Sequence, residues 1–480
     1  MPRCAANSPT RRRRHRRPPR RSPERAPSRA IEAAAAQRAP VNPYSPPNMN
    51  TDRFADLSAE KKALLLQRLT AMKRETAATP AALREAVTPH LSVDRRPLLS
   101  LYAAGELEPV DAVAVGCLSD RLLRQNPQLD TRHFTHALCH DLPIFANVRT
   151  LAAGRIASVI LPRFYSQIYL DQSDIVRLVR QCQSLAKVLG ARMVSLTGLI
   201  PSATDYGRAV PEDDALPPVT TGHATTTSAV VLSVRRLLAT AGRRLEDETL
   251  AFIGLGSIGS STLRLLLSVL PHPRRLILCD IYQKREYVER LMQEVRDELG
   301  FRGELSFHHE SRGVAPQAYE ATLIVGATNA PDVVEVSRLR PGTLIVDDSD
   351  PHCFNPEQAI ARLEAHGDIL FSEGGALAAP APFEHLAYIP TEFAQQLPVD
   401  TTPGTERRIT GCVLSSLLSA ARHYPSTRGD VKLADALAHY RGLYDEGFDA
   451  APLHCGHYAI AQERVDAFVA NHSAHALKLA

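Results

Sequence analysis

A six-residue loop carries three glycines at a spacing that suits phosphate binding. It directly follows the apolar run Thr249–Ile253 and precedes a stretch with helical spacing of apolar residues. In such a turn the first glycine allows a tight bend, the second lets backbone approach a pyrophosphate, and the third lets the next helix pack closely. The helix N-terminus also attracts phosphate charge. We therefore predict a dinucleotide-binding loop formed by Gly254, Leu255, Gly256, Ser257, Ile258 and Gly259.

An acidic residue stands where such a site needs one. The strand-like run Arg275–Asp280 ends in an acid 21 residues beyond Gly259, and a carboxylate there can bind ribose hydroxyls. Asp280 favours NADH, whereas Lys284 and Arg285 just beyond it could hold the 2′-phosphate of NADPH. We predict NADPH as the cofactor, with NADH as the alternative.

One cysteine has surroundings that favour reactivity. Cys412 stands near the start of an apolar helical pattern, Arg407 and Arg408 precede it, and Thr405-Glu406 could cap the helix. A cysteine in the first turns of a helix near cations has a stabilised thiolate, which is the reactive form. On these residues alone the alternative is a small core side chain, the usual role of a cysteine on an apolar helix.

Alternating strand and helix patterns would position these residues. A strand-like run at 155–162, a helix at 173–189 and a strand at 192–196 precede the loop, and further strands fit at 321–325, 343–347 and 368–371. This alternation is the signature of a doubly wound parallel sheet in an α/β protein. Thr328 follows one of these strands and would face the nicotinamide at the carboxyl ends of the strands.

The same patterns predict the domain organisation. An Arg- and Pro-rich tail without periodicity cannot bury enough apolar surface to order itself. Ser58 caps a predicted helix from Leu57 to Leu69, and helical patterns continue to about 145. We predict a disordered tail over 1–48, a helical N-terminal region over 49–148, an α/β substrate domain over 149–240, a Rossmann domain over 241–395 and a helical C-terminal segment over 396–480 that carries Cys412.

Composition and charge exclude several classes of protein. The net charge is +4, but residues 1–38 carry twelve Arg against two Glu, or +10, so the remainder carries −6. A mildly acidic body argues against nucleic acid as a partner. No apolar run is long enough for a membrane span. The eight scattered cysteines predict reduced thiols in a cytoplasmic protein. His133, His136, Cys139 and His140 could share a helix face, but without a nearby carboxylate we predict no metal site.

The segments flanking the loop resemble the long-chain acyl-[acyl-carrier-protein] reductases of cyanobacteria, over about residues 150–480. Among them, Gly411–Leu418 resembles the cysteine-bearing helix of that family. The others, in the order of the family, are Gly154–Pro162, Thr220–Thr226, Leu344–Asp347 with Pro351, Gly374-Gly375, Glu384-His385 and Gly456–Ile460.

The resemblance implies a reaction through a covalent intermediate. It makes Cys412 the nucleophile that attacks a thioester on the phosphopantetheine arm of an acyl or peptidyl carrier protein. Reduction of the acyl-enzyme by NAD(P)H would release an aldehyde. Thr221 or His223 could donate a hydrogen bond to the developing oxyanion.

Departures from the family leave the substrate and other functions open. The loop reads GLGSIG where the family has GATGDIG, and His223 stands where the family has Asn. An assembly-line acyl or aminoacyl thioester therefore remains as plausible as a fatty acyl chain. One alternative is an oxidoreductase like glutamyl-tRNA reductase or shikimate dehydrogenase, without a catalytic Cys412. Another is a nucleotide-binding protein without catalysis.

Overall fold

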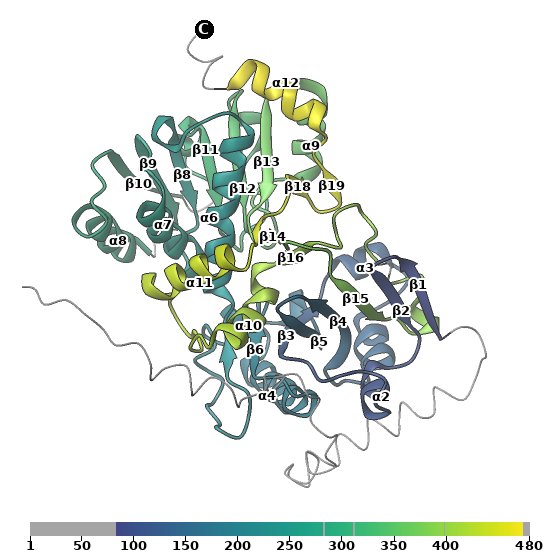
Figure 1. Cartoon of the computed structure of the whole chain (residues 1–480). Coiled ribbons are helices and arrows are strands. Elements are labelled where there is room, and N and C mark those ends of the chain that lie inside the picture. Colours follow the sequence, from purple (N-terminus) through teal and green to yellow (C-terminus); the bar gives the residue numbers. More distant parts are fainter. Residues whose placement is uncertain (1–82, 282–283, 311–312, 398, 474–480) are drawn as a thin grey trace, which may run out of the picture. The chain divides into compact units, whose positions relative to one another are not determined.

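Two large β-sheets organise the protein (Figure 1). The computed structural model describes residues 83–473 except 282–283, 311–312 and 398. The predicted tail over 1–48 and the capped helix from Leu57 to Leu69 lie outside the described residues. The α/β fold class predicted from the alternating patterns is confirmed.

One of the two sheets is a Rossmann sheet of six parallel strands. Its order is β10-β9-β8-β11-β12-β13, which is the 3-2-1-4-5-6 order of a dinucleotide-binding fold. Each expected strand is present, with ends shifted by no more than two residues. The strands are β8 (Thr249–Ile253), β9 (Arg275–Asp280), β10 (Glu304–His309), β11 (Leu323–Gly326), β12 (Thr343–Asp347) and β13 (Ile369–Glu373).

Helices bury the Rossmann sheet, which explains its nearly continuous apolar strands. All five residues of β8 and of β12 are buried. The largest buried hydrophobic cluster joins these strands to side chains of α6 and α7. The helices attached to this sheet are α6 (His223–Thr240), α7 (Ser257–Val269), α8 (Arg285–Asp297), α9 (Pro356–His366) and α12 (Gln462–His472).

A second sheet of eight strands mixes parallel and antiparallel pairs, in the order β1-β2-β15-β4-β5-β3-β6-β7. Its core packs against α4, a helix capped by the Asp171 side chain and ended by Gly190 in the left-handed region at φ 88°. The strands are β1 (Arg84–Thr88), β2 (Leu91–Asp94), β3 (Ala112–Leu118), β4 (Ile144–Leu151), β5 (Gly154–Phe164), β6 (Met193–Leu196), β7 (Val219–Thr220) and β15 (Glu384–Tyr388). The helices are α2 (Leu98–Ala103), α3 (Arg121–Gln125), a π-helical turn (His133–Leu138), α4 (Gln172–Leu189) and α5 (Ile200–Ala203).

This sheet corrects two of the predicted domain boundaries. The region over 49–148 was expected to be helical, yet in its described part it supplies three strands and most of a fourth. Short strands with few alternating residues, such as Leu91–Asp94, are held by pairing with distant segments, so local spacing does not reveal them. The Rossmann domain was expected to extend to 395, but β15 leaves it and pairs with β2 and β4 of the other sheet.

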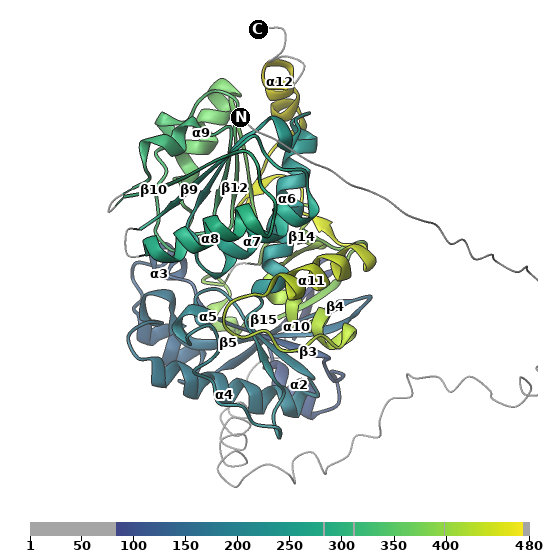
Figure 2. The same cartoon turned by 90° about the vertical axis from the view of Figure 1, so that its left-hand side faces the viewer.

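The C-terminal segment lies between the two sheets, as Figure 2 shows for α10 and α11. Helix α10 (Gly411–Arg422) packs on β3, β5 and β6 of the mixed sheet, and both it and α11 (Leu433–Asp445) pack on α6. Small sheets join this segment to the Rossmann domain. They comprise β14 (Ala376–Ala378), β16 (Arg408–Thr410) and β17 (Asp449–Ala450), and the hairpin of β18 (His454–Cys455) with β19 (Tyr458–Ala459). No helix in the described part of the chain has the length and apolar character to cross a bilayer.

Candidate active site

The predicted phosphate loop lies between β8 and α7, and its three glycines have distinct roles. Gly254 has φ +87°, and a Cβ there would lie 2.5 Å from the carbonyl oxygen of Ala327. A Cβ at Gly259 would lie 2.0 Å from the oxygen of Gly254, so only glycine lets α7 approach the loop. At Gly256 a Cβ would meet nothing within 4 Å, which leaves the loop backbone open to a pyrophosphate. The loop therefore fits a dinucleotide.

The acid at the end of β9 lies against the same loop. The Asp280 carboxylate accepts hydrogen bonds from the amides of Leu255 at 2.7 Å and Ile281 at 2.7 Å. Lys284 forms an ion pair with it at 3.1 Å. A ribose would meet this carboxylate, and the ammonium group of Lys284 is available to a 2′-phosphate nearby. Thr328 faces the loop too, since a Cβ at Gly254 would lie 3.0 Å from the Thr328 Cβ.

Cys412 occupies the second position of α10, half-buried, after the N-cap Thr410. The prediction that this cysteine lies in the first turn of a helix is confirmed. The predicted cap and cations are wrong, because the helix begins at Gly411 rather than at Thr405-Glu406. Arg408 forms an ion pair with Asp400 at 3.0 Å, and Arg407 donates to the carbonyl of Pro380. Both arginines stand just before the helix in the chain, and each bonds to a group other than Cys412.

Because neither arginine bonds to Cys412, its sulfur lacks the cations that were expected to stabilise a thiolate. Burial raises the pKa of this thiol above its ordinary value, and the nearby Asp348 carboxyl raises it further. Three hydrogen bonds oppose the increase, one with the Thr410 hydroxyl and two with the backbone of Gly198 and Val413. The resting group is therefore a thiol whose sulfur is surrounded by groups that stabilise negative charge once its proton leaves.

Two glycines bring the first turns of α6 and α10 together. Gly222, at φ +77°, immediately precedes α6, and a Cβ there would lie 3.0 Å from the Cα of Cys412. In return, a Cβ at Gly411 would lie 3.0 Å from the Cα of Thr226 in α6. The close approach places both helix N-termini, with their positive ends, beside the Cys412 sulfur.

The two other predicted catalytic residues lie in this junction. Thr221 is fully buried, and its hydroxyl oxygen accepts from the amide of His223 at 3.4 Å. The His223 Nδ1 lies 2.9 Å from the Ser257 hydroxyl of the phosphate loop. Burial lowers the pKa of His223 to about 4, so its imidazole is neutral at physiological pH. His223 thus connects the thiol-bearing junction to the dinucleotide loop.

A cavity of about 460 Å³ collects these residues. Its wall includes Cys412, Thr221 and His223 together with Ile258 of the phosphate loop. The other predicted cofactor residues do not line this cavity. They lie in the phosphate loop, at the end of β9 and after β11. The cavity lies where the carboxyl ends of the Rossmann strands meet the mixed sheet, which is the usual ligand position in such folds.

Sequence reasoning missed an acid in this cavity. Asp348 follows β12, and a Cβ at Gly375 would lie only 2.3 Å from its Oδ1, so the carboxyl lies directly over that glycine. Burial raises the pKa of Asp348 well above its ordinary value, and the charges of Asp347, Asp350 and Glu373 raise it further. A carboxyl with a raised pKa beside a thiol can act as a proton donor. The signal in the sequence is three acids, at 347, 348 and 350, after a buried strand.

A buried hydroxyl was missed as well. The Thr226 side chain lines the cavity, and its Oγ1 is buried without a hydrogen-bond partner in the described structure. A buried hydroxyl without a partner carries a desolvation cost that a ligand oxygen would relieve. It is therefore a candidate oxyanion donor beside Thr221, whose hydroxyl oxygen accepts from His223 and whose proton can still be donated.

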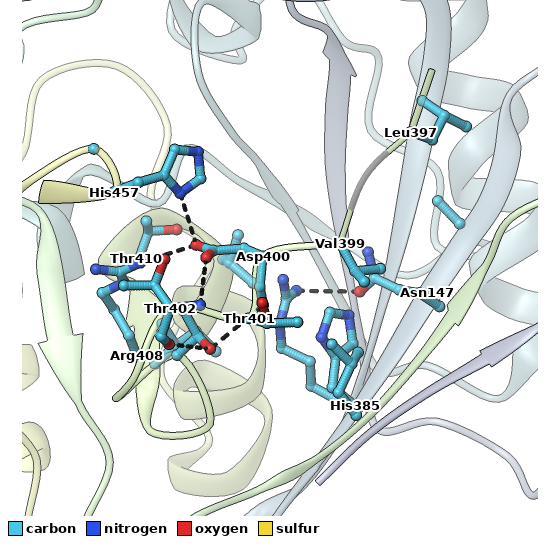
Figure 3. A pocket seen from close by; sticks show the side chains of 18 of the residues that line it. Asn147, His385, Leu397, Val399, Asp400, Thr401, Thr402, Arg408, Thr410 and His457 are labelled. Carbon is cyan, nitrogen blue, oxygen red and sulfur yellow. Dashed lines mark hydrogen bonds and ion pairs between the residues drawn. The ribbon is translucent and has the colours of Figure 1, made fainter. Parts of the chain in front are cut away.

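A second cavity of about 880 Å³ adjoins the first, since both are lined by Arg121, Glu373, Ala376 and Thr410. Polar and apolar side chains both line this cavity, and Figure 3 shows the part of its wall where Asp400 interacts with His457 and Arg408. The Arg149 guanidinium lines this wall and donates to Asn147 at 3.1 Å and Ser158 at 3.2 Å. Burial lowers the pKa of Arg149 to about 10, and it forms no ion pair with a described carboxylate.

Comparisons with known proteins give fold-level similarity only. No family model matches the chain. L-tryptophan dehydrogenase from Nostoc punctiforme is 14% identical over 70% of this chain and 79% of that chain, with a TM-score of 0.32. Malic enzyme from Entamoeba histolytica is 12% identical over 88% and 96%, with a TM-score of 0.34. Shikimate 5-dehydrogenase from Listeria monocytogenes is 10% identical over 54% and 86%, with a TM-score of 0.27. Similarity at this level assigns neither substrate nor reaction, so the function has to be argued from the site.

Proposed function

We propose that this protein is an NAD(P)H-dependent oxidoreductase that reduces a carrier-bound acyl thioester to an aldehyde through an acyl-enzyme on Cys412. The observation that carries the proposal is the cavity shared by the Cys412 sulfur, the Asp348 carboxyl, whose pKa burial raises, and the first turn of the phosphate-loop helix. A nucleophile, a proton donor and a dinucleotide loop at one cavity are the parts that such a reduction requires.

In the first step the Cys412 sulfur bonds to the thioester carbonyl carbon, and the bond from that carbon to the carrier sulfur breaks. The proton lost by Cys412 is taken up by the departing carrier thiol, with the neutral His223 imidazole as a relay in the same cavity. Hydrogen bonds with the backbone of Gly198 and Val413, together with the N-terminus of α10, stabilise the sulfur as its proton leaves. The unpartnered Thr226 hydroxyl is placed to donate to the oxyanion.

The second step reduces the acyl-enzyme. The phosphate loop and Asp280 would hold NAD(P)H, which when bound would supply the hydride for the carbonyl carbon. Asp348 donates a proton to the carbonyl oxygen, which gives a hemithioacetal on Cys412. The carbon–sulfur bond then breaks, the hydroxyl proton returns to the sulfur, and the aldehyde leaves. The net reaction consumes one hydride and one proton per thioester, and the proton on Asp348 is replaced from solvent.

The larger cavity bears on the substrate class. Its wall is mixed, but the Arg149 guanidinium, which forms no ion pair with a described carboxylate, favours a polar part of the acyl group or of the pantetheine arm over an alkyl chain at that point. A partner that delivers such an arm would be an acyl or peptidyl carrier protein. This preference departs from the fatty acyl chains that the sequence resemblance implies.

Intact-protein mass spectrometry tests the covalent step. The full chain is incubated with an acyl-pantetheine thioester and no cofactor, and we expect a mass increase of one acyl group. The adduct should be absent in Cys412→Ala and present in Cys182→Ala, a matched control on α4 that is distant in the fold and equally conservative. Addition of NADPH should remove the adduct and release aldehyde.

Three outcomes would overturn the proposal. An equal adduct in Cys412→Ala would place acylation elsewhere. Oxidoreductase activity on a hydroxy or amino acid that persists in Cys412→Ala would favour a dehydrogenase that needs no thiol. Dinucleotide binding without any adduct or turnover would leave a nucleotide-binding protein.

A further inference from the structure

We propose that the protein binds a zinc ion through the side chains of His352, Glu373 and Cys455. One potential ligand atom from each, an imidazole nitrogen, a carboxylate oxygen and a thiol sulfur, lies within 4.8 Å of the others. Within the described residues, one group of at least three histidine, cysteine or acidic side chains has its donor atoms this close together, and it is this one. Nitrogen, oxygen and sulfur donors together suit zinc better than the hard cations magnesium and calcium.

The distances between the donor atoms agree with one shared ion. His352 Nε2 lies 3.7 Å from Cys455 Sγ and 3.8 Å from Glu373 Oε1. Ligand atoms at zinc bond lengths of about 2.0 to 2.3 Å on the corners of a tetrahedron lie about 3.4 to 3.6 Å apart. A movement of a few tenths of an ångström would therefore suffice for the two pairs that include His352, whereas the Glu373 and Cys455 donor atoms, which lie within 4.8 Å of each other, would close by up to about 1 Å.

Neighbouring groups hold two of the three ligands in the required orientation. The Nδ1–H of His352 donates to the buried Asp347 carboxylate at 3.0 Å, which leaves Nε2 directed at Glu373 and Cys455. Glu373 is held by His454 Nε2 at 3.3 Å and by the amide of Gly456. A carboxylate behind a ligating histidine is the usual support of a zinc site, because it orients the ring and raises the basicity of the ligand nitrogen.

The three ligands come from segments far apart in the chain. His352 follows β12, Glu373 ends β13, and Cys455 lies in β18 of the C-terminal hairpin. No metal site was expected from the sequence, since the one group of neighbouring histidines, around His133, was taken to lack a nearby carboxylate. The histidines considered there behave differently, since His136 pairs with Asp141 at 2.8 Å.

The site opens to the cavity that contains Cys412. His352 and Glu373 both line that cavity, whereas Cys455 is buried behind them. Three protein ligands with a fourth position facing a cavity are the arrangement of a reactive zinc site, in which water or a substrate oxygen completes the tetrahedron. The same ion would attach the C-terminal hairpin to the edge of the Rossmann sheet.

Metal analysis of the purified full chain tests the site without any substrate or cofactor. After exposure to zinc chloride and removal of loosely bound metal, we expect about one zinc per chain by mass spectrometry of the elements. Cys455→Ser and His352→Gln should each weaken zinc binding by at least about 100-fold. Cobalt should give a thiolate-to-cobalt charge-transfer absorption in the wild-type chain and not in Cys455→Ser.

Matched controls distinguish loss of the zinc site from misfolding. They also keep the test independent of the proposed reaction at Cys412. Cys182→Ala and His366→Gln, at a core cysteine and a surface histidine, should keep the zinc, as should Cys412→Ala. Circular dichroism shows whether each variant folds, and His454→Asn, which changes only a neighbour of Glu373, should weaken binding by about 10-fold. A folded wild-type chain that takes up no zinc, or zinc that survives both ligand substitutions, overturns the proposal.

Discussion

Two adjacent acids at the end of β12 have opposite surroundings. Asp347 is buried, and its oxygens accept from the amides of Ser349 and Cys353 and from His352. These bonds hold the loop that follows the strand. Asp348, one residue later, lies over Gly375 and lines the cavity, where burial and neighbouring charge raise its pKa well above the ordinary value. Asp347 therefore stabilises the loop after β12, whereas Asp348 is available to donate a proton in the cavity.

Replacement of Asp348 tests its role as a proton donor. In Asp348→Asn an amide takes the place of the acid, so we expect thioester reduction to fall by about 10²- to 10³-fold. The acyl adduct on Cys412 should still form, because that step uses other groups. Steady-state rates with NADPH and intact-mass analysis measure the two steps separately. Asp297→Asn on the surface of α8 serves as the control, and full activity in Asp348→Asn would assign the proton to another group.

His223 should make stability depend on pH. Burial lowers its pKa in the folded state to about 4, below the 6.5 of an exposed histidine. Between these values the unfolded chain binds a proton that the folded chain does not, so stability is complete above about pH 6.5 and is lost as the pH falls toward 4. The difference of about 2.5 pKa units corresponds to on the order of 3 kcal/mol.

Urea unfolding at pH 7 and pH 4.5 measures this contribution. His223→Asn keeps a polar group near Ser257 and removes the titration, so it should lose less stability on acidification than the wild-type chain. His366→Asn, at an exposed position, should behave like the wild type. If acidification destabilises His223→Asn as strongly as the wild type, the buried imidazole is not the responsible group.

The site residues that could be predicted from the sequence are those that belong to a recognisable pattern of neighbouring residues. The loop glycines and Asp280 follow a spacing that the backbone imposes, and Cys412 was found through a resemblance. Asp348, Thr226 and the group around Cys455 depend on which segments pack together, so no local pattern reveals them. The cations near Cys412 show the converse error, since proximity in the sequence did not become contact in the fold.

At the scale of secondary-structure elements, the crossing of α6 and α10 sets the position of the thiol. Neither helix could approach the other so closely with a side chain at Gly222 or Gly411. The contact also aligns two helix N-termini toward one cavity, which a single helix could not provide. The geometry of the nucleophile therefore depends on two residues that have no side chains.

Gly222→Ala should show this dependence. The added Cβ would lie 3.0 Å from Cys412 Cα at a backbone φ of +77°, so steric repulsion and backbone strain add. We expect the free energy of unfolding to fall by about 1–3 kcal/mol and acylation of Cys412 to slow. Gly300→Ala is the control, because its φ is +68° and nothing lies within 4 Å of its Cβ. Equal effects of the two substitutions would show that only strain matters.

Prediction from sequence found the strands of the Rossmann sheet except β10, whose residues are only partly buried, and failed for part of the other sheet. The Rossmann strands are buried on both faces and alternate with helices, so their apolar runs are distinctive. The strands before residue 148 are short, and β1 is largely exposed. Their structure is determined by pairing with β15, which lies almost 300 residues later in the sequence, and local reasoning cannot detect such a partner.

At the scale of the whole molecule, α6 belongs to both halves. Val230, Val231 and Val234 enter the core of the Rossmann sheet, whereas Ala229 and Leu232 pack in a cluster with β3, β5 and α10. A helix that contributes to two cores couples their stability, because the loss of either core exposes part of the same helix.

Substitution in α6 should therefore affect both sheets. Val231→Ala removes two buried methyl groups, and we expect a loss of about 2 kcal/mol in the free energy of unfolding. Hydrogen exchange measured by mass spectrometry should show reduced protection in β5 and β8 together, and urea should unfold the chain in one transition. Loss of protection in β8 alone would show that the two halves open independently.

The position of β15 has a consequence for synthesis of the chain. This strand separates β2 from β4, and it is made only after the whole Rossmann domain. While the ribosome elongates the chain from residue 95 to residue 383, the hairpin of β1 and β2 has no neighbour in its sheet, although the strands from β3 to β7 can already pair. The nascent protein must therefore keep an open edge on β4, exposed to other chains and to chaperones, until the segment Glu384–Tyr388 emerges and closes it.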